Sequence, residues 1–324
     1  MKVLYGYRDL AGKLKSPIVA IGMFDGLHIG HKRVLNKVLS SRMPESDKVV
    51  ITFDPHPQMV LSPKKVPLRI MSLEHRLYIF QKMGFSSVVI LRFTEFMAKM
   101  SAEDFIKKIL RGMGTKRVYV GENFYFGKNK SGDISTFRSV GKKYGIEVIT
   151  VPQVKMKRRI VSSTWLRRLI TFGKLKKAEL LLRRPVSVLG KVVKGDKRGS
   201  VLGVPTANID PHQEVIPPPG VYAVKVDING SLCDGVLNVG FKPTFYGRKL
   251  RKRKEPSSEV HLIDFNGDLY GSVLEIFFIK RLRKEKKFKK QDNLVFQIKK
   301  DIKEAQVFLT SKKMLSRIER YKSL

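Results

Sequence analysis

The stretch PIVAIGMFDGLHIGH, residues 17–31, joins different sequence patterns in a short space. Residues 17–22 are an apolar run of strand length, and the loop that follows has glycine at positions 22, 26 and 30. An amphipathic stretch comes next, at residues 32–40. Glycines let the backbone come close to a phosphate, and the first turn of a helix offers free N–H groups to it. The stretch therefore predicts a strand, an anion-binding loop and a helix, as in an α/β nucleotide site.

The same alternation of apolar runs and amphipathic stretches continues to residue 151. Further strands are predicted at 48–53, 87–93, 117–121 and 147–151, and further helices at 73–82, 102–110 and 135–144. Strands that are apolar on both faces and separated by helices indicate a parallel sheet covered on both sides. Ligands of such sheets bind at the carboxyl ends of the strands. Chemistry is therefore expected in the loops after Gly22, Phe53 and Gly121.

The second half of the chain has a different character. Its alternating or β-branched runs lie at 186–195, 220–226, 234–239, 259–265 and 273–282, separated by turn sequences such as PPPG and FNGD. Short strands punctuated in this way predict an antiparallel barrel or a sandwich. Apolar residues at helical spacing over 291–309 predict one terminal helix that packs on it.

Two short helices are predicted between the halves. Ser163 or Thr164 caps the first helix, which ends at Gly173, and the second covers residues 175–182. Pro185 cannot continue a helix, so a boundary is expected there. The predicted domains are residues 1–183 and 184–324.

The composition is that of a globular protein rather than a disordered or disulfide-rich one. Hydrophobic residues make up 42 % of the 324 residues, and the single cysteine, Cys233, excludes an internal disulfide. No apolar run approaches the roughly 20 residues of a membrane helix, and the first residues lack the apolar core of a secretory signal. A cytoplasmic protein with no membrane partner is expected.

The charge is the unusual feature of the composition. The chain has 65 Lys and Arg against 28 Asp and Glu, which gives a formal net charge of +37. A field of this sign attracts anions such as nucleotides, RNA or an acidic membrane surface. Lysines that are simply solvated would explain most of the excess without any partner. We expect no obligatory nucleic acid, weak RNA binding stays open, and the oligomeric state is not predicted.

His28 and His31 lie three residues apart at the predicted start of a helix. At that spacing both rings can face one phosphate, and an imidazole N–H donates to phosphate oxygens. Two other interpretations remain open. A zinc site would need a third ligand at a recognisable spacing, which the sequence does not show. The histidines could also cap the helix without binding a ligand.

This stretch resembles the HxGH signature of nucleotidylyltransferases. Segments along nearly the whole chain narrow the resemblance to the bacterial bifunctional riboflavin kinase/FAD synthetases. They occur in the family's order: TFDPHP (52–57), GENFYFG (121–127), SSTWLR (162–167), GDKRG (195–199), PTAN (205–208), PGVY (219–222), NVG (238–240), EVHLIDF (259–265), LYG (269–271) and RKE (283–285). A single HxGH would be a weak indication, whereas this ordered set is specific.

The resemblance implies two activities in one chain. An N-terminal Rossmann-like nucleotidylyltransferase domain with a parallel sheet would transfer AMP from ATP to FMN, giving FAD and pyrophosphate. A small C-terminal antiparallel β-barrel with a terminal helix would phosphorylate riboflavin with ATP, giving FMN, with Mg²⁺ on the ATP phosphates. ATP, riboflavin, FMN and FAD are thus the expected substrates or products.

For the adenylyl transfer, the attacking FMN phosphate is already mostly dianionic near pH 7, because its second pKa is about 6. It needs alignment and charge neutralisation rather than a base. The resemblance assigns catalytic roles to His28, His31 and Arg167, which offer N–H donors. It assigns nucleotide or flavin contacts to further residues: Gly22, Phe24, Asp25, Gly30, His56, Asn123, Ser163 and Thr164.

For the kinase step, the primary hydroxyl of riboflavin needs a group that accepts its proton. Glu259 stands where the family places this base, and without that context it would be an ordinary surface carboxylate. The Thr206 hydroxyl and the Asn208 carbonyl are hard ligands suited to Mg²⁺. Alone, the sequence PTAN would equally allow a plain turn.

Four other residues of the second half are also considered, two of them with more than one interpretation. Gly195 and Gly199 would let the backbone approach the nucleotide. Arg283 either contacts the flavin phosphate or is solvated. His261 alternates with Glu259 on one strand face, and either orients that carboxylate or packs.

Two other functions would explain part of the sequence. A different HxGH nucleotidylyltransferase leaves PTAN and the strand of Glu259 unexplained. An RNA-binding protein is favoured by the net charge of +37 and by the barrel. Stacking on RNA would need aromatic residues interleaved with basic ones on a strand, and the basic run at 249–254, KLRKRK, has none.

Overall fold

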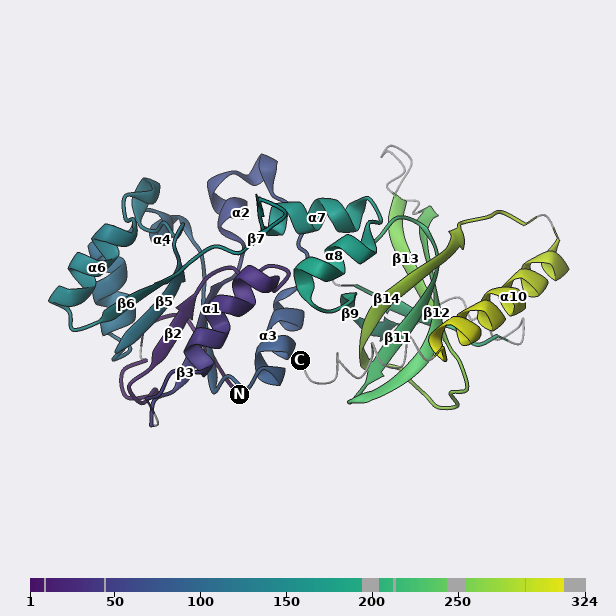
Figure 1. Ribbon diagram of the computed structural model, residues 1–324, viewed down its shortest axis with the longest axis horizontal. Coiled ribbons are helices and arrows are strands. Elements are labelled where there is room, and N and C mark those ends of the chain that lie inside the picture. Colours follow the sequence, from purple (N-terminus) through teal and green to yellow (C-terminus); the bar gives the residue numbers. More distant parts are fainter. Residues whose placement is uncertain are drawn as a thin grey trace. The chain divides into compact units, whose positions relative to one another are not determined.

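The computed structural model describes residues 1–311, apart from 9, 44, 194–203, 212–213, 244–253 and 289 (Figure 1). The chain forms two compact units. The first unit comprises residues 1–68 and 73–163, and the second comprises residues 69–72 and 164–324. The division into functional domains at residues 183 and 184 stays a prediction.

The first unit is built on a six-stranded parallel sheet. Its strands are β1 (Lys2–Tyr5), β2 (Ile18–Ile21), β3 (Lys48–Phe53), β4 (Ser87–Leu91), β5 (Arg117–Gly121) and β6 (Glu147–Val151). They pair in the order β1-β4-β3-β2-β5-β6, with every pair parallel. The predicted parallel sheet is thus confirmed. The sequence does not predict β1, because this edge strand of four mostly exposed residues carries little pattern.

Apolar side chains cover both faces of this sheet. One face, which includes Val19, Ile51 and Val118, packs against the segment 97–113. On the other face, alternate residues such as Ala20 and Val50 are also fully buried. The remaining elements are α1 (Ile29–Leu39), α2 (Pro57–Leu61), η1 (Pro63–Lys65), α3 (Leu73–Lys82), α4 (Glu95–Ala98), α5 (Ala102–Asp104), the π-helix η2 (Phe105–Arg111), η3 (Lys128–Lys130), α6 (Ile134–Lys143), β7 (Lys155–Met156) and β8 (Arg159–Ile160).

The second unit is built on a closed antiparallel barrel in the order β10-β13-β12-β11-β14-β9. Its strands are β9 (Val186–Val193), β10 (Ala207–Asp210), β11 (Gly220–Ile228), β12 (Ser231–Pro243), β13 (Lys254–Leu262) and β14 (Val273–Lys284). Outside the barrel, Ala305 and Leu309 of α10 (Gln291–Leu309) pack against Val221, Ala223 and Val236. The barrel with a terminal helix is confirmed, and the sandwich alternative is excluded.

The strand β10 corrects one of the two interpretations of PTAN. Read alone, that sequence equally allows a turn, but Ala207 and Asn208 begin a strand. This strand pairs with β9 on one side and with β13 on the other, so it closes the barrel. The partners lie far away in sequence, and a local window therefore does not contain the information that makes this segment extended.

The helices α7 (Ser163–Thr171) and α8 (Leu175–Leu182) confirm the two predicted short helices. The expected cap is wrong, because Ser163 and Thr164 both lie within α7. A segment from earlier in the chain, residues 69–72, also belongs to the second unit. The N–H and Oγ of Ser72 both donate to Oε1 of Glu214 at 2.8 Å, and the N–H of Leu189 donates to Oε2 at 3.3 Å. A buried carboxylate thus fixes this short segment to the barrel.

A buried ionic cluster lies where β9 and β14 meet. Ser187 Oγ donates to Glu275 at 2.7 Å, and Arg184 lies 3.5 Å from the same carboxylate oxygen. Both charged side chains are nearly inaccessible, and burial lowers the pKa of the Arg184 guanidinium while Glu275 opposes that shift. Because the pair is enclosed, each charge depends on the other.

We expect Glu275→Ala to lower the free energy of unfolding by about 3–5 kcal/mol, because it leaves Arg184 buried without its partner. The matched control is Glu304→Ala, which removes an exposed carboxylate 3.2 Å from Lys280. That change should cost less than about 1 kcal/mol. Denaturant unfolding of both variants checks the comparison, and equal losses would show that burial does not matter here.

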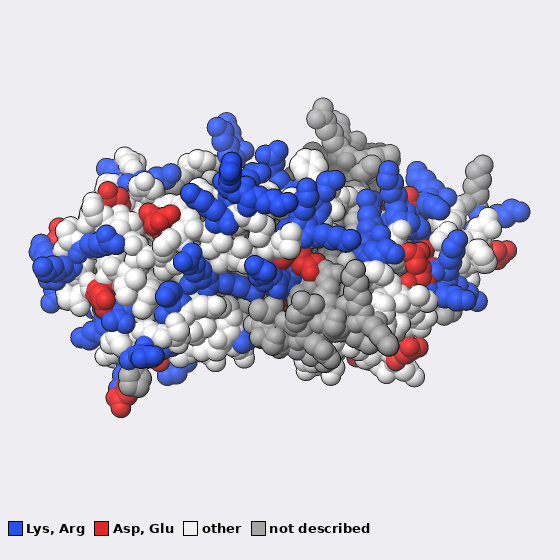
Figure 2. Space-filling model, viewed as in Figure 1, with Lys and Arg blue, Asp and Glu red and all other residues white. Residues whose placement is uncertain are grey.

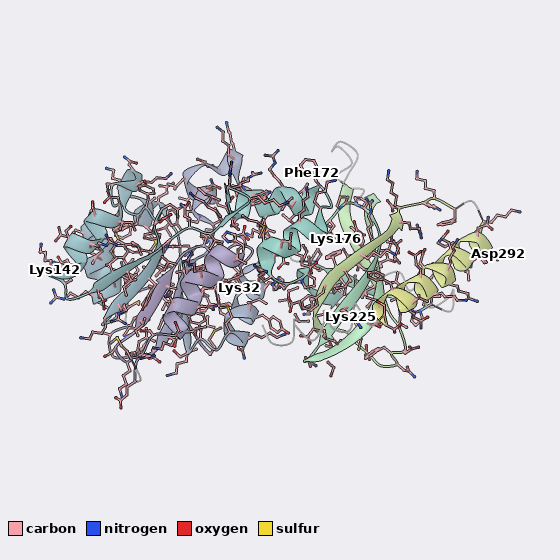
Figure 3. The ribbon with its side chains drawn as sticks, in the orientation of Figure 1. Lys32, Lys142, Phe172, Lys176, Lys225 and Asp292 are labelled. Carbon is pink, nitrogen blue, oxygen red and sulfur yellow. The ribbon has the colours of Figure 1, made fainter. Side chains whose placement is uncertain are left out.

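Positive charge is spread over both units. On the face shown in Figure 2, Lys and Arg predominate over Asp and Glu across each of them. Lys142 at the end of α6 and Lys176 on α8 are exposed examples (Figure 3). Within the described part of the chain, no helix is long and apolar enough to cross a membrane.

Candidate active sites

The loop between β2 and α1 has a strained backbone that burial holds in place. Phe24 and Leu27 have backbone φ angles of 51° and 44°, values that residues other than glycine rarely adopt. Their side chains are 2 % and 0 % exposed, so packing maintains the conformation. Such strain is typical of ligand-binding loops. The loop presents the histidines of HxGH at the carboxyl end of β2.

The two histidines form a single stacked pair. The ring centroids of His28 and His31 lie 3.7 Å apart, with 19° between their planes. His28 is the N-cap of α1, and its Nδ1 accepts the backbone N–H of His31 at 3.3 Å. The proton of a neutral His28 is therefore on Nε2, which remains as a donor. His31 Nδ1 is buried and has no hydrogen-bond partner among the described residues. His28 thus caps α1, as one open interpretation expects, and binding of a ligand by its Nε2–H stays a prediction.

Both imidazoles are neutral at physiological pH. Burial lowers the pKa of His28 to about 4. The pKa of His31 is lowered well below its usual value by burial, and further by the charges of His28 and Arg76. The pair therefore offers hydrogen bonds rather than full positive charges to a ligand.

The lowered pKa values predict acid sensitivity of the fold. The unfolded chain takes up protons near pH 6.5 while the folded chain resists until about pH 4, so stability falls as pH decreases through this window. From the shift of His28 alone, we expect the free energy of unfolding to drop by about 2 kcal/mol between pH 7 and pH 5. Denaturant unfolding at several pH values measures this loss. His28→Asn retains a cap without a titrating ring, and it should show a smaller decrease.

Arg76 supports the loop from beneath, and the sequence gives no sign of it. This side chain of α3 is 3 % exposed. Its Nη1 donates to the carbonyl of Met23 at 2.8 Å and to Oγ1 of Thr52 at 2.6 Å. One buried guanidinium thus joins the loop after β2 to the end of strand β3. A single arginine within a helix looks like a solvated residue, so only the tertiary contacts identify its role.

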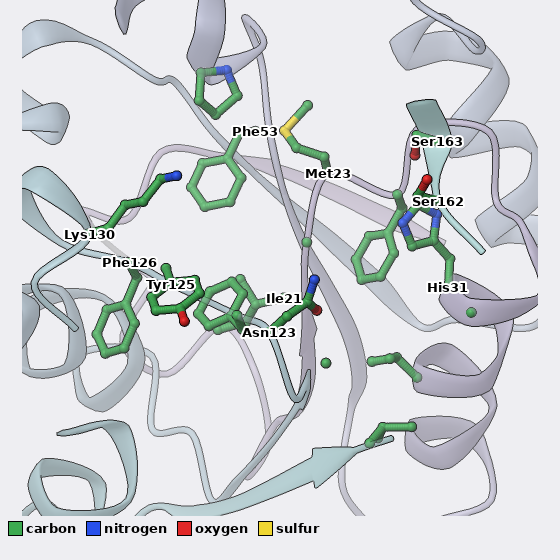
Figure 4. Close-up of a pocket in the computed structure, with 18 of the residues that line it drawn as sticks. Ile21, Met23, His31, Phe53, Asn123, Tyr125, Phe126, Lys130, Ser162 and Ser163 are labelled. Carbon is green, nitrogen blue, oxygen red and sulfur yellow. The ribbon is translucent and has the colours of Figure 1, made fainter. Parts of the chain in front are cut away.

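A cavity of about 970 Å³ opens at this end of the sheet. Its walls include Gly22, Phe24, His28, Gly30, His31, Asn123 and Ser163, all predicted as site residues. Figure 4 shows His31 and Ser163 on one side of this cavity, and Tyr125, Phe126 and Lys130 on the other. The polar side suits phosphates, and the aromatic side suits a flat ring system. The aromatic wall is not among the predicted site residues, although it lies in the quoted third loop.

At two positions of the loop, neighbouring side chains lie so close that they leave little room for a residue larger than glycine. A Cβ on Gly30 would lie 3.1 Å from Cε1 of His28, and a Cβ on Gly22 would lie 3.0 Å from the ring of Phe24. These approaches are tighter than ordinary contacts. The glycines therefore serve the packing of the loop itself as well as access for a ligand.

The other predicted residues of this site have different surroundings. Ser163 Oγ donates to the carbonyl of Asp25 at 2.8 Å, so these two residues connect the first loop with the start of α7. His56 is the N-cap of α2 and accepts the N–H of Gln58 at 3.1 Å. Thr164 and Arg167 lie on α7 in the second unit. Binding roles for all of these residues stay predictions.

The barrel places the predicted kinase residues in one row. In register across the sheet, Asn208 of β10 lies opposite Glu259 of β13, which lies opposite Asn238 of β12. The row continues through Val221 of β11 to Arg283 of β14. Directly opposed residues share one face of a sheet. Val221 belongs to the cluster under α10, so this is the outer face of the barrel. Asn238, a neighbour of Glu259, belongs to the quoted NVG segment but is not among the predicted site residues.

Arg283 already has a structural partner. Its guanidinium donates to both carboxylate oxygens of Asp301 at 2.7–3.0 Å, which anchors α10 to β14. The solvated interpretation is therefore wrong, and a contact with flavin phosphate stays a prediction. Thr206 directly precedes β10. The predicted Gly195 and Gly199 lie outside the described residues.

Comparisons with known proteins match each half of the chain to a family. Residues 11–165 match the family described as FAD synthetase, and residues 182–309 match the family described as riboflavin kinase. The bifunctional riboflavin kinase/FMN adenylyltransferase of Bacillus subtilis (strain 168) is 35 % identical over 295 residues, which is 89 % of this chain and 91 % of that protein. Its namesake from Haemophilus influenzae is 33 % identical over 96 % of this chain and 100 % of that protein.

A solved structure has the same architecture. The crystal structure called Macrolide-efflux Protein from Streptococcus pneumoniae superposes with a TM-score of 0.80 at 29 % identity, over 94 % of this chain and 99 % of that one. The two family matches together span most of the chain, and the relatives are aligned over nearly their full length. On these matches, the chain belongs to the family of bifunctional riboflavin kinase/FMN adenylyltransferases.

Proposed function

We propose that this chain converts riboflavin to FMN in its barrel and FMN to FAD in its parallel-sheet unit, using one ATP in each step. The observation that carries the proposal is that the histidine pair and the carboxylate proposed as the kinase base lie on different units. The HxGH pair lies in the cavity beyond β2, and Glu259 lies in register with Asn208 on the barrel.

In the first step, the primary hydroxyl of riboflavin attacks the γ-phosphorus of ATP and ADP leaves. Glu259 accepts the hydroxyl proton, which makes the oxygen a competent nucleophile. The strand fixes the position of the Glu259 backbone between two neighbours in register, and positioning is the main requirement for phosphoryl transfer. Asn208 and Asn238 flank it on adjacent strands.

The donor set beside Glu259 fits Mg²⁺ on the ATP phosphates. Mg²⁺ prefers oxygen ligands and is commonly held by few protein groups together with phosphates and water. Thr206 and Asn208 supply a hydroxyl and a carboxamide oxygen, and no cluster of three or more His, Cys, Asp or Glu side chains forms a closed metal cage among the described residues. Bound there, the ion would neutralise charge on the phosphates. Thr206 and Asn208 would fix where those phosphates lie.

In the second step, a phosphate oxygen of FMN attacks the α-phosphorus of a second ATP, and pyrophosphate leaves. The attacking dianion needs no base. The neutral N–H groups of His28 and His31 donate to phosphate oxygens, and both side chains are largely buried, which strengthens such hydrogen bonds. Asn123 and the aromatic wall bind the flavin or the adenine.

The test is a time course with purified protein, riboflavin, ATP and Mg²⁺, in which chromatography separates the flavins. FMN should rise first and FAD should then replace it. Riboflavin left unchanged would refute the kinase assignment, and supplied FMN left unchanged would refute the transferase assignment.

Two further assignments accompany this function. The single cysteine suits a reducing compartment, so we place the enzyme in the cytoplasm. The excess charge would attract the anionic substrates, and RNA is not required for either step. A gel-shift titration against RNA at increasing salt concentration tests the alternative, because nucleic-acid binding decreases steeply with salt.

A further inference from the structure

His261 makes a contact that neither the packing nor the orienting interpretation anticipates. It lies on β13 two residues beyond Glu259, and alternate residues of a strand share a face. Its Nδ1 lies 2.8 Å from the carbonyl oxygen of Pro205. A carbonyl only accepts hydrogen bonds, so Nδ1 carries the proton and donates it. The partner of His261 is thus the PTAN segment rather than Glu259.

The register of β10 and β13 explains why this contact matters. Ala207 lies opposite Val260 and Asn208 lies opposite Glu259, so the next position of the ladder would place Thr206 opposite His261. The strand begins only at Ala207, however, and Thr206 has no place in the ladder. The ring of His261 reaches one residue further, to Pro205. Thr206 is therefore held between a backbone ladder on one side and a side-chain hydrogen bond on the other.

The chemistry of proline strengthens this restraint. Its ring fixes φ, so the rotation about ψ decides where the Pro205 carbonyl points and where the next peptide begins. A hydrogen bond to that carbonyl fixes the remaining rotation. The peptide it fixes leads directly into Thr206, whose hydroxyl is the proposed phosphate-side ligand.

We propose that His261 is a positioning residue of the kinase site: its Nδ1–H holds the Pro205 carbonyl and thereby fixes the Thr206 hydroxyl beside Glu259. The inference rests on the proposed kinase function of this site. His261 touches neither substrate and takes no part in proton transfer.

The kinetic test compares two substitutions at this position. His261→Leu removes the donor, whereas the amide nitrogen of His261→Asn lies close to the position of Nδ1 and keeps one. We expect His261→Leu to raise the KM for ATP in riboflavin phosphorylation about tenfold, the order expected for one lost hydrogen bond, with a smaller change in kcat. His261→Asn should restore most of the loss. Adenylylation of supplied FMN should not change in either variant, and Lys191→Ala, an exposed substitution on β9, serves as the surface control.

A double-mutant cycle separates positioning from general stability. If His261 acts through Thr206, then His261→Leu should add little to the defect of Thr206→Val. Losses that multiply, a wild-type KM in His261→Leu, or equal defects in the Leu and Asn variants would each overturn the proposal.

Nitrogen-15 NMR of histidine-labelled protein tests the contact without any turnover. The signal absent from His261→Asn identifies the ring, which should carry its proton on Nδ1. An unprotonated Nδ1 would overturn the proposal. This measurement holds even if the wild-type chain leaves riboflavin unchanged, a result that would instead refute the kinase function itself.

Discussion

Glu259→Gln is expected to lower the rate of riboflavin phosphorylation by about 10²- to 10⁴-fold, the range in which a positioned general base contributes. The amide has nearly the shape of the carboxylate but cannot accept the hydroxyl proton. Neighbours in register, Asn208 and Asn238, keep their places on β10 and β12. The loss should therefore fall on kcat, with little change in the KM for riboflavin.

The second activity of the chain is the internal control for this variant. FAD formation from supplied FMN should keep its wild-type rate, because the histidine pair belongs to the other unit. Glu304→Gln, an exposed carboxylate of the barrel unit, should leave both rates unchanged. Retention of more than about a tenth of the kinase rate in Glu259→Gln would mean that another group accepts the proton.

The fold was predictable wherever local pattern and tertiary structure agree. Strands such as β3 and β4 are apolar on both faces, and this pattern alone indicates a covered parallel sheet. The start of β13 shows where prediction from the local sequence fails. It begins at Lys254, several residues before the predicted start at Glu259, in a stretch with lysine, glutamate and proline. Its pairing with β12 makes that stretch extended, and no local pattern records such pairing.

The residues of the candidate sites also divide into those that the local sequence predicts and those that only tertiary contacts identify. The pairing of His28 and His31 was predictable, because a spacing of three residues at the start of a helix lets both rings face the same way. Arg76 was not, since its partners, Met23 in a loop and Thr52 on β3, are far away in sequence. For Arg283, the sequence allowed an interpretation that the structure excludes. Its basic surroundings made solvation a natural alternative, and only the structure brings Asp301 of α10 against it.

The substitution His28→Asn is expected to lower the rate of FAD formation from FMN by about 10²- to 10³-fold, as the loss of one transition-state donor does in other enzymes. The asparagine oxygen can replace Nδ1 as acceptor for the N–H of His31, so the cap of α1 survives. What disappears is the Nε2–H, the donor that the proposed transferase mechanism directs at a phosphate oxygen. Because a donor to developing charge acts in the transition state, the loss should fall on kcat more than on the KM for ATP.

Comparison with His28→Ala separates the two functions of this ring. Alanine removes both the donor and the cap, so it should match the rate loss of asparagine and also lower the free energy of unfolding by about 1 kcal/mol. Riboflavin phosphorylation should be unchanged in both variants, since that chemistry belongs to the barrel. If asparagine transferred AMP at the wild-type rate while alanine failed, His28 would serve only as the cap of α1. His31 would then be the residue that stabilises the phosphates, and His31→Asn would show the loss of the rate of FAD formation.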